Sequence, residues 1–286
     1  TLDVDGGTIK LDGNYPVGSN NVALGDTALD SLSSGTNNTA LGSAALTTAS
    51  SGSNNVAVGF NALTANTTAG YNVAFGTNTL AGNTTGSENA VFGGAAALAN
   101  TTGTGLTGAG YTSLRFNTTG NYNTAIGDAA LYSNTTASNN TAVGYQAAYT
   151  NTTGAINSAF GLQALYSNTT ANNNSAFGAL SLYSNTTGSE NTAVGREALQ
   201  ANTTASSNTA VGYQAGYSNT TGAENVLVGY KAGYSSTTGN GLTAVGRQAL
   251  EDNTASNNTA LGFAVLSNNT TGGFNTALGG ANYGFT

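Results

Sequence analysis

The side chains that could carry acid–base chemistry in this sequence are a small set of carboxylates. Two facing carboxyl groups could hydrolyse a glycosidic bond, and the candidate pairs are Glu251 with Asp252 and Glu190 with Glu197. Neither pair recurs along the chain, and side chains next to each other on a strand point apart. The chain has no His and no Cys, which excludes His- and Cys-based nucleophilic catalysis and the usual zinc sites. We therefore expect no enzyme activity, no catalytic residue, no metal site and no cofactor.

Aromatic and basic side chains recur at intervals of 17 residues. Such rows can simply stack from one repeat to the next. They can also form a stripe that contacts a glycan or a protein receptor, because exposed Tyr binds sugars and a row of weak contacts gives avidity. Both interpretations remain open. One row is Tyr132, Tyr149, Tyr166, Tyr183, Tyr217 and Tyr234, and the other is Arg196, Tyr213, Tyr230 and Arg247.

These rows belong to a repeat that covers nearly the whole chain and contains one glycine at a fixed place. A fixed period of this length predicts a solenoid, in which each unit contacts mainly its neighbours. The spacing is 17 residues except before Gly262, where it is 16. The glycines are Gly25, Gly42, Gly59, Gly76, Gly93, Gly110, Gly127, Gly144, Gly161, Gly178, Gly195, Gly212, Gly229, Gly246, Gly262 and Gly279.

We number positions in the repeat from this glycine as zero. Glycine in every copy and β-branched residues at −3 and −1 oppose a helix. The pattern predicts a strand from −4 to −1, a turn at the glycine, a second strand from about +1 to +5, and a loop from +6 to +12. The residue missing before Gly262 falls in that loop, where deletions are tolerated.

The expected fold is therefore all-β, a parallel β-solenoid of about sixteen 17-residue coils over residues 18–286. At about 4.8 Å per coil, these coils would span roughly 75 Å. Residues 1–17 alternate apolar and polar side chains around a Gly-Gly pair. We expect a short β-hairpin there, which caps the solenoid or joins it to another domain.

Position −4 is nearly always Asn, which predicts a structural ladder of side-chain amides. Amides stacked one above another can form hydrogen bonds along the axis of a β-stack. The clearest run of this ladder is Asn140, Asn157, Asn174, Asn191, Asn208 and Asn225.

Apolar residues occupy both faces of the predicted strands. Positions −2 and −1 are adjacent and should point to opposite faces, and the same should hold for +3 and +4. The small Ala at −2 suits a narrow interior, whereas Val, Leu, Ile or Phe at −1 needs another cover. Identical chains would supply that cover, so we expect a homo-oligomer. A trimer fits a parallel fibre about one long axis.

The repeat resembles the head repeats of trimeric autotransporter adhesins and, more closely, the repeat arrays of phage tail-fibre and virion-fibre proteins. The resemblance covers about residues 18–281 and lies in units such as Asn140-Thr141-Ala142-Val143-Gly144-Tyr145-Gln146-Ala147. It implies a left-handed β-roll that forms a homotrimer. It also implies attachment to a glycan or protein on a host cell, and other virion or fibre proteins at the ends.

The resemblance leaves open where such a fibre would be located. A phage tail fibre in the virion is the first expectation, and a bacterial cell-surface adhesin head is the alternative. A less favoured third is an ice-binding solenoid that uses the Thr rows at +8 and +9. Twelve acidic against five basic residues oppose nucleic-acid binding. The sequence has no run of about 18 apolar residues, so we expect no membrane insertion.

Overall fold

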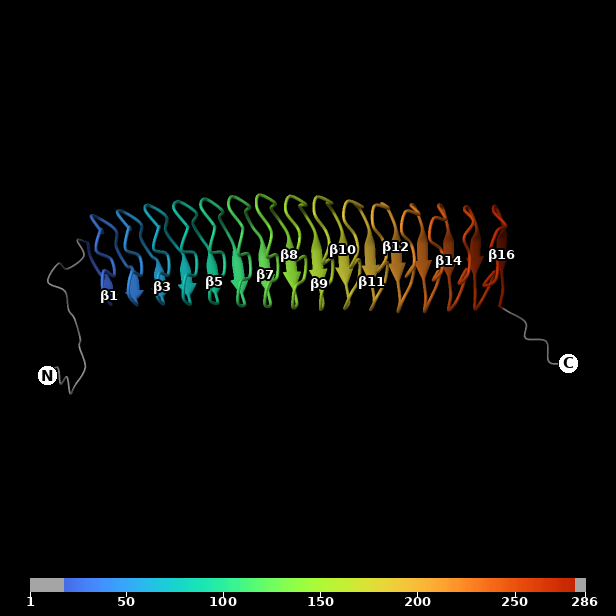
Figure 1. Ribbon diagram of the computed structural model, residues 1–286, viewed down its shortest axis with the longest axis horizontal. Helices are drawn as coiled ribbons and strands as arrows, with labels where there is room; N and C mark the ends of the chain where they lie inside the picture. Colours follow the sequence, from blue (N-terminus) through green and yellow to red (C-terminus); the bar gives the residue numbers. More distant parts are fainter. Residues whose placement is uncertain (1–17, 281–286) are drawn as a thin grey trace, which may run out of the picture. The chain divides into compact units, whose positions relative to one another are not determined.

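The computed structural model describes residues 18–280, which form two compact units on either side of the boundary between Ser138 and Asn139. Each unit is a parallel β-solenoid without helices, which confirms the predicted fold class (Figure 1). No helix in the described range could therefore cross a membrane. The predicted hairpin at residues 1–17 lies outside the described residues.

Every coil contributes one strand of three residues, which ends immediately before the repeat glycine. The strand prediction at −4 to −1 is therefore confirmed to within one residue. The first unit contains β1 (Val22–Leu24), β2 (Thr39–Leu41), β3 (Val56–Val58), β4 (Val73–Phe75), β5 (Ala90–Phe92), β6 (Thr107–Ala109) and β7 (Thr124–Ile126). The second contains β8 (Thr141–Val143), β9 (Ser158–Phe160), β10 (Ser175–Phe177), β11 (Thr192–Val194), β12 (Thr209–Val211), β13 (Val226–Val228), β14 (Thr243–Val245), β15 (Thr259–Leu261) and β16 (Thr276–Leu278).

Within each unit, consecutive strands pair in parallel, and residue i lies beside residue i+17. Thr192 pairs with Thr209, for example, and Ala193 with Ala210. The shortened repeat does not break this register, since Thr243 of β14 pairs with Thr259 of β15. The chain thus absorbs the deletion between the strands, as the loop interpretation predicted. We call residues at the same repeat position in successive coils a column.

The predicted second strand at +1 to +5 is wrong, because this segment is a series of turns. The residues at +2 and +4 are left-handed: φ is 60° at Glu197 and 49° at Leu199. An extended strand needs negative φ. The turns are nevertheless bonded from coil to coil, as the N–H of Glu197 donates to Ala179 O of the coil before and that of Leu199 to Ala215 O of the coil after.

These left-handed residues also correct the predicted placement of the apolar side chains. On β11, Ala193 points inward and is buried while Val194 points outward and is exposed, as expected for a strand. In the turn, however, Ala198 at +3 and Leu199 at +4 are both buried. The wrapped backbone brings two adjacent side chains to the same interior. The core of a coil is therefore an Ala from the strand with an Ala–Leu pair from the turn.

One stretch of the core exchanges large and small residues between these positions. β13 carries Leu227 at the inward position, where most strands carry Ala, and glycine replaces Leu at Gly216 and Gly233. A Cβ at Gly216 would lie 2.7 Å from Leu227 Cδ1, and a Cβ at Gly233 would lie 2.7 Å from its Cδ2. The two glycines thus leave room for the single leucine, because a close-packed interior tolerates volume changes only when they compensate.

The predicted Asn ladder at −4 is confirmed, with a more specific bonding pattern than stacked amides alone. The six Asn residues of the run named above are buried. The Oδ1 of Asn191 accepts from the backbone N–H of Asn208 at 3.0 Å, and its Nδ2 donates to Ala205 O at 2.8 Å. An amide-to-amide bond also joins Asn208 Nδ2 to Asn191 Oδ1 at 3.2 Å. Each amide therefore satisfies backbone groups that the narrow coil would otherwise bury unpaired.

A second buried Asn column, at +7, lies in the segment that the sequence suggested was a tolerant loop. Asn202 donates from Nδ2 to Asn185 Oδ1 at 2.8 Å and to Ala205 O at 3.0 Å, and it accepts from Asn219 at 2.9 Å. The next residue is also structural, because the Thr203 hydroxyl donates to Thr220 O at 3.1 Å. The Asn-Thr pair that begins this segment is thus part of the scaffold.

The +7 column is interrupted at Ser236, which replaces Asn. Ser236 is buried, yet its Oγ has no hydrogen-bond partner, and neither does Oδ1 of Asn219 in the coil before. The serine side chain is too short to replace the missing amide. A buried polar atom without a partner costs free energy.

We predict that Ser236→Asn stabilises the protein, because the new amide can donate to Asn219 Oδ1 and to a backbone carbonyl, as the other amides of the column do. The expected gain is about 1–2 kcal/mol in the free energy of unfolding, measured as a higher midpoint of thermal or urea unfolding. Thr238→Asn, at an exposed position of the same turn, is the matched control and should change little. An unchanged or lower midpoint for Ser236→Asn would contradict this explanation of the gap.

Candidate functional site: the aromatic and basic columns

The candidate contact residues occupy two columns on either side of the buried Ala–Leu pair. The +5 column is half-buried and the +1 column is exposed. Neither column contributes to the core. All ten predicted residues lie in the second unit except Tyr132, which lies in the first.

The +5 column is a stack of tyrosine rings. The ring centroids of Tyr149 and Tyr166 are 5.2 Å apart with an interplanar angle of 4°, and those of Tyr166 and Tyr183 are 5.2 Å apart at 14°. Gln200 interrupts the stack, which resumes with Tyr217 and Tyr234 at 5.1 Å. The packing interpretation is therefore confirmed for these five tyrosines.

Tyr132 is the member of this column that lies in the first unit. Within its own unit its ring meets Phe116 edge-on, with centroids 5.0 Å apart and an interplanar angle of 88°. Arg115 lies beside the same Phe116 ring, 5.7 Å from its centroid. This small cluster is the first unit's counterpart of the aromatic and basic contacts described next.

The +1 column packs cations against rings in the coils from Arg196 to Phe263. Arg196 lies 5.9 Å from the Tyr213 ring centroid, and the rings of Tyr213 and Tyr230 stack at 5.5 Å. The Arg247 guanidinium follows, 5.5 Å from the Tyr230 ring and 5.3 Å from the Phe263 ring. The four predicted members of this column are thus in direct succession. Phe263 extends the column, and its position directly after a repeat glycine was the sequence signal for it.

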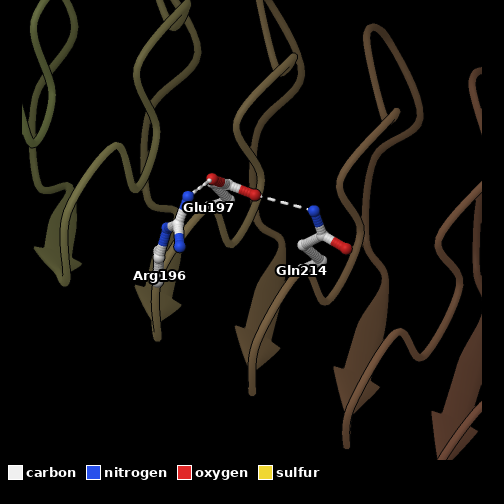
Figure 2. Close-up of polar contacts among 3 residues, drawn as sticks. All are labelled: Arg196, Glu197 and Gln214. Carbon is white, nitrogen blue, oxygen red and sulfur yellow. Dashed lines mark hydrogen bonds and ion pairs between the residues drawn. The ribbon is translucent and has the colours of Figure 1, made fainter.

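The +2 column supplies polar support between the two aromatic columns. Arg196 Nη2 forms an ion pair with Glu197 Oε1 at 2.7 Å, and Gln214 Nε2 donates to Glu197 Oε2 at 2.7 Å (Figure 2). In the next coil, Lys231 Nζ lies 4.8 Å from the Tyr234 ring and 5.7 Å from the Tyr230 ring. Lys231 therefore connects the +1 and +5 columns.

The carboxylates considered for acid–base chemistry are each held by non-carboxylate partners. Both oxygens of the buried Glu197 are occupied, whereas the exposed Glu190 accepts from Ser207 Oγ at 3.4 Å. Glu251 accepts from Gln248 at 2.7 Å, and Asp252 accepts from Ser235 at 2.9 Å. In the described part of the chain, no three His, Cys, Asp or Glu residues cluster as a metal-binding group.

The threonine rows proposed for ice binding serve different roles. Hydroxyls at +8 donate to carbonyl oxygens of the next coil, as Thr169 Oγ1 does to Thr186 O at 3.1 Å and Thr186 Oγ1 to Thr203 O at 3.0 Å. The +8 threonines up to Thr220 are half-buried, whereas the +9 threonines, such as Thr187, are exposed. Half of the supposed Thr surface is therefore engaged in the scaffold, which weakens the ice-binding alternative.

We predict that Tyr166→Ala lowers the free energy of unfolding by about 1–3 kcal/mol, because Tyr166 is stacked on both sides and each aromatic pair contributes roughly 0.5–1.5 kcal/mol. Chemical denaturation followed by circular dichroism measures the change. Tyr166→Phe is the matched control, since it keeps both stacked pairs, and it should be nearly neutral. Equal stability of Tyr166→Ala and the unmodified protein would show that the stack contributes nothing to the fold.

Comparison of the chain with protein-family models, with curated proteins and with solved structures found no match.

Proposed function

We propose that this protein is a structural fibre or adhesin shaft that works as a homotrimer and presents a receptor-binding surface for attachment to a host cell. A phage tail fibre is the first candidate, so the protein would be part of the virion. The alternative is the head of a bacterial trimeric adhesin at the cell surface. Both candidates share one architecture, a left-handed β-roll in each chain.

The observation that carries this proposal is the exposed apolar column at −1. Phe177 is 39% exposed and Val194 is 38% exposed, although both are large apolar residues on a strand. The same column exposes Leu41, Phe75 and Phe92 in the first unit. Monomeric soluble proteins rarely expose contiguous apolar patches larger than a few hundred Å². A row repeated coil after coil is the kind of surface that another chain covers.

Identical chains are the partner that fits this column best. Since the column repeats at one residue per coil, a second copy aligned in parallel presents the same side chains at the same spacing. The two pairs Phe75–Phe92 and Phe160–Phe177 are already stacked along it, with centroids 5.6 Å and 4.9 Å apart. A closed cyclic arrangement about the fibre axis would place every copy of the column in an equivalent environment. The number three comes from the resemblance to trimeric fibres.

The proposal predicts a mass of about 84 kDa in solution, three times the chain mass of 28.1 kDa, and elongated particles by electron microscopy. The double variant Phe177→Asp with Val194→Asp should reduce this mass, because it would place like charges and unpaired carboxylates in the interface. Multi-angle light scattering measures both masses.

Thr187→Asp with Thr204→Asp is the matched control, because these exposed threonines lie in the same two coils outside the apolar column. It should leave the mass unchanged. Circular dichroism checks that each variant is folded. A monomeric mass for the unmodified protein would refute the oligomer. Flanking sequence would distinguish the two candidate functions. A membrane anchor would indicate an adhesin, and a tail-docking module would indicate a phage fibre.

A further inference from the structure

The basic residues of this acidic chain are concentrated in one short stretch. The chain carries five Lys and Arg against twelve Asp and Glu. Three of the five, Arg196, Lys231 and Arg247, belong to the four coils that begin at Gly195, Gly212, Gly229 and Gly246. At about 4.8 Å per coil, the first and last of these cations are separated by roughly 14 Å along the unit. They are adjacent to the exposed rings of the +1 column.

Arg247 is held in place without being neutralised. Its guanidinium is flanked by Tyr230 in the coil before and Phe263 in the coil after. A guanidinium packed on aromatic faces keeps its in-plane N–H groups free, and these form a planar fork that matches a carboxylate. Within residues 18–280, neither Arg247 nor Lys231 has a carboxylate partner. The rings therefore orient a cation whose charge is left for a ligand.

Arg196 is the third cation, and its geometry leaves it partly available. Its side chain is 61% exposed, and its ion pair with the nearly buried Glu197 uses Nη2 (Figure 2). Gln214 binds the other oxygen of Glu197, which fixes that carboxylate in place. The remaining guanidinium N–H groups can bind a second acceptor, because Arg carries five donors.

The stacked rings favour a hydroxyl-rich ligand over an apolar one. In the +1 column, the faces of Tyr213 and Tyr230 are covered by each other and by the flanking arginines. A stack therefore presents ring edges and phenol hydroxyls to solvent, rather than the faces on which a neutral sugar ring would lie. Phenol hydroxyls both donate and accept hydrogen bonds, so a row of them suits the hydroxyls of a carbohydrate.

We propose that the +1 column from Arg196 to Phe263, together with Lys231, binds a linear oligosaccharide that carries carboxylate groups, such as a chain of uronic acid units. The cations would bind the carboxylates, and Tyr213 and Tyr230 would bind sugar hydroxyls. The proposal deepens the attachment role proposed above and rests on it, since a trimer would present three such sites and gain avidity. Three cations on a chain of net charge −7 are too few for nucleic acid.

The test uses galacturonic acid hexamer as the probe and isothermal titration calorimetry on the intact protein. The methyl ester of the same hexamer removes the charge and keeps the sugar, and we expect it to bind at least tenfold more weakly. The double variant Arg247→Gln with Lys231→Gln should also lose at least tenfold in affinity. Arg115→Gln is the matched control, because Arg115 also lies beside an aromatic ring but belongs to the first unit, and it should bind as the unmodified protein does.

Three results with the sugar would each overturn the inference: no saturable binding at millimolar hexamer, equal binding of the ester, or unchanged affinity of the double variant. Equally tight binding of hexaglutamate would also overturn it, because that result would indicate an acidic protein partner. Light scattering on the same samples separates this test from that of the fibre. A trimer that fails to bind refutes the carbohydrate site alone, and a monomer that binds refutes the fibre alone.

Discussion

Each coil in this protein satisfies many of its buried polar groups on the coils before and after it. A few bonds close within a coil, such as Ala198 N–H to Gly195 O, but the other buried N–H and C=O groups find partners along the axis. The strands supply part of this network through parallel pairing. The turns supply another part, because backbone donors at +2 bond backward and those at +4 bond forward. The Asn columns at −4 and +7 complete it from side chains.

This constraint explains why the chain tolerates unfavourable backbone conformations. A non-glycine residue in the left-handed region costs of order 1 kcal/mol or more, and each regular coil contains three, such as Glu190, Glu197 and Leu199. The repeat glycine is a further case: φ at Gly212 is 136°, and a Cβ there would lie 2.5 Å from Gly229 O. Neighbouring coils offset these costs together, so an isolated coil would not be stable.

Some of this architecture could be predicted from residue types, and some could not. The period, the strand before each glycine and the −4 ladder follow from residues whose preferences are strong, namely Gly, β-branched residues and Asn. The turn at +1 to +5 could not be predicted, because Gln214 or Leu199 at φ near 50–60° contradicts intrinsic preference and depends on bonds to adjacent coils. The second Asn column was missed for a related reason, since Asn-Thr-Thr is typical of exposed loops.

Part of the candidate site could likewise be predicted from the sequence, and part could not. Spacing by 17 residues identified Tyr213, Tyr230 and Arg247 as one column, since register alone places them together. Stacking of the rings was one of two interpretations of that spacing, and it is observed. Spacing does not reveal that Glu197 is occupied on both oxygens by Arg196 and Gln214. Those features depend on side-chain rotamers and local crowding. They decide which groups remain available to a ligand.

The in-register pairing of Thr192 with Thr209, and of every strand with the next one in its unit, has a consequence for how such a protein can change in length. An added 17-residue segment would receive the same neighbours as the segments beside it, so it would need no new interface. Length would then vary in whole coils, each adding about 4.8 Å. The length of such a unit would be set by its number of repeats, independently of the side chains that face solvent.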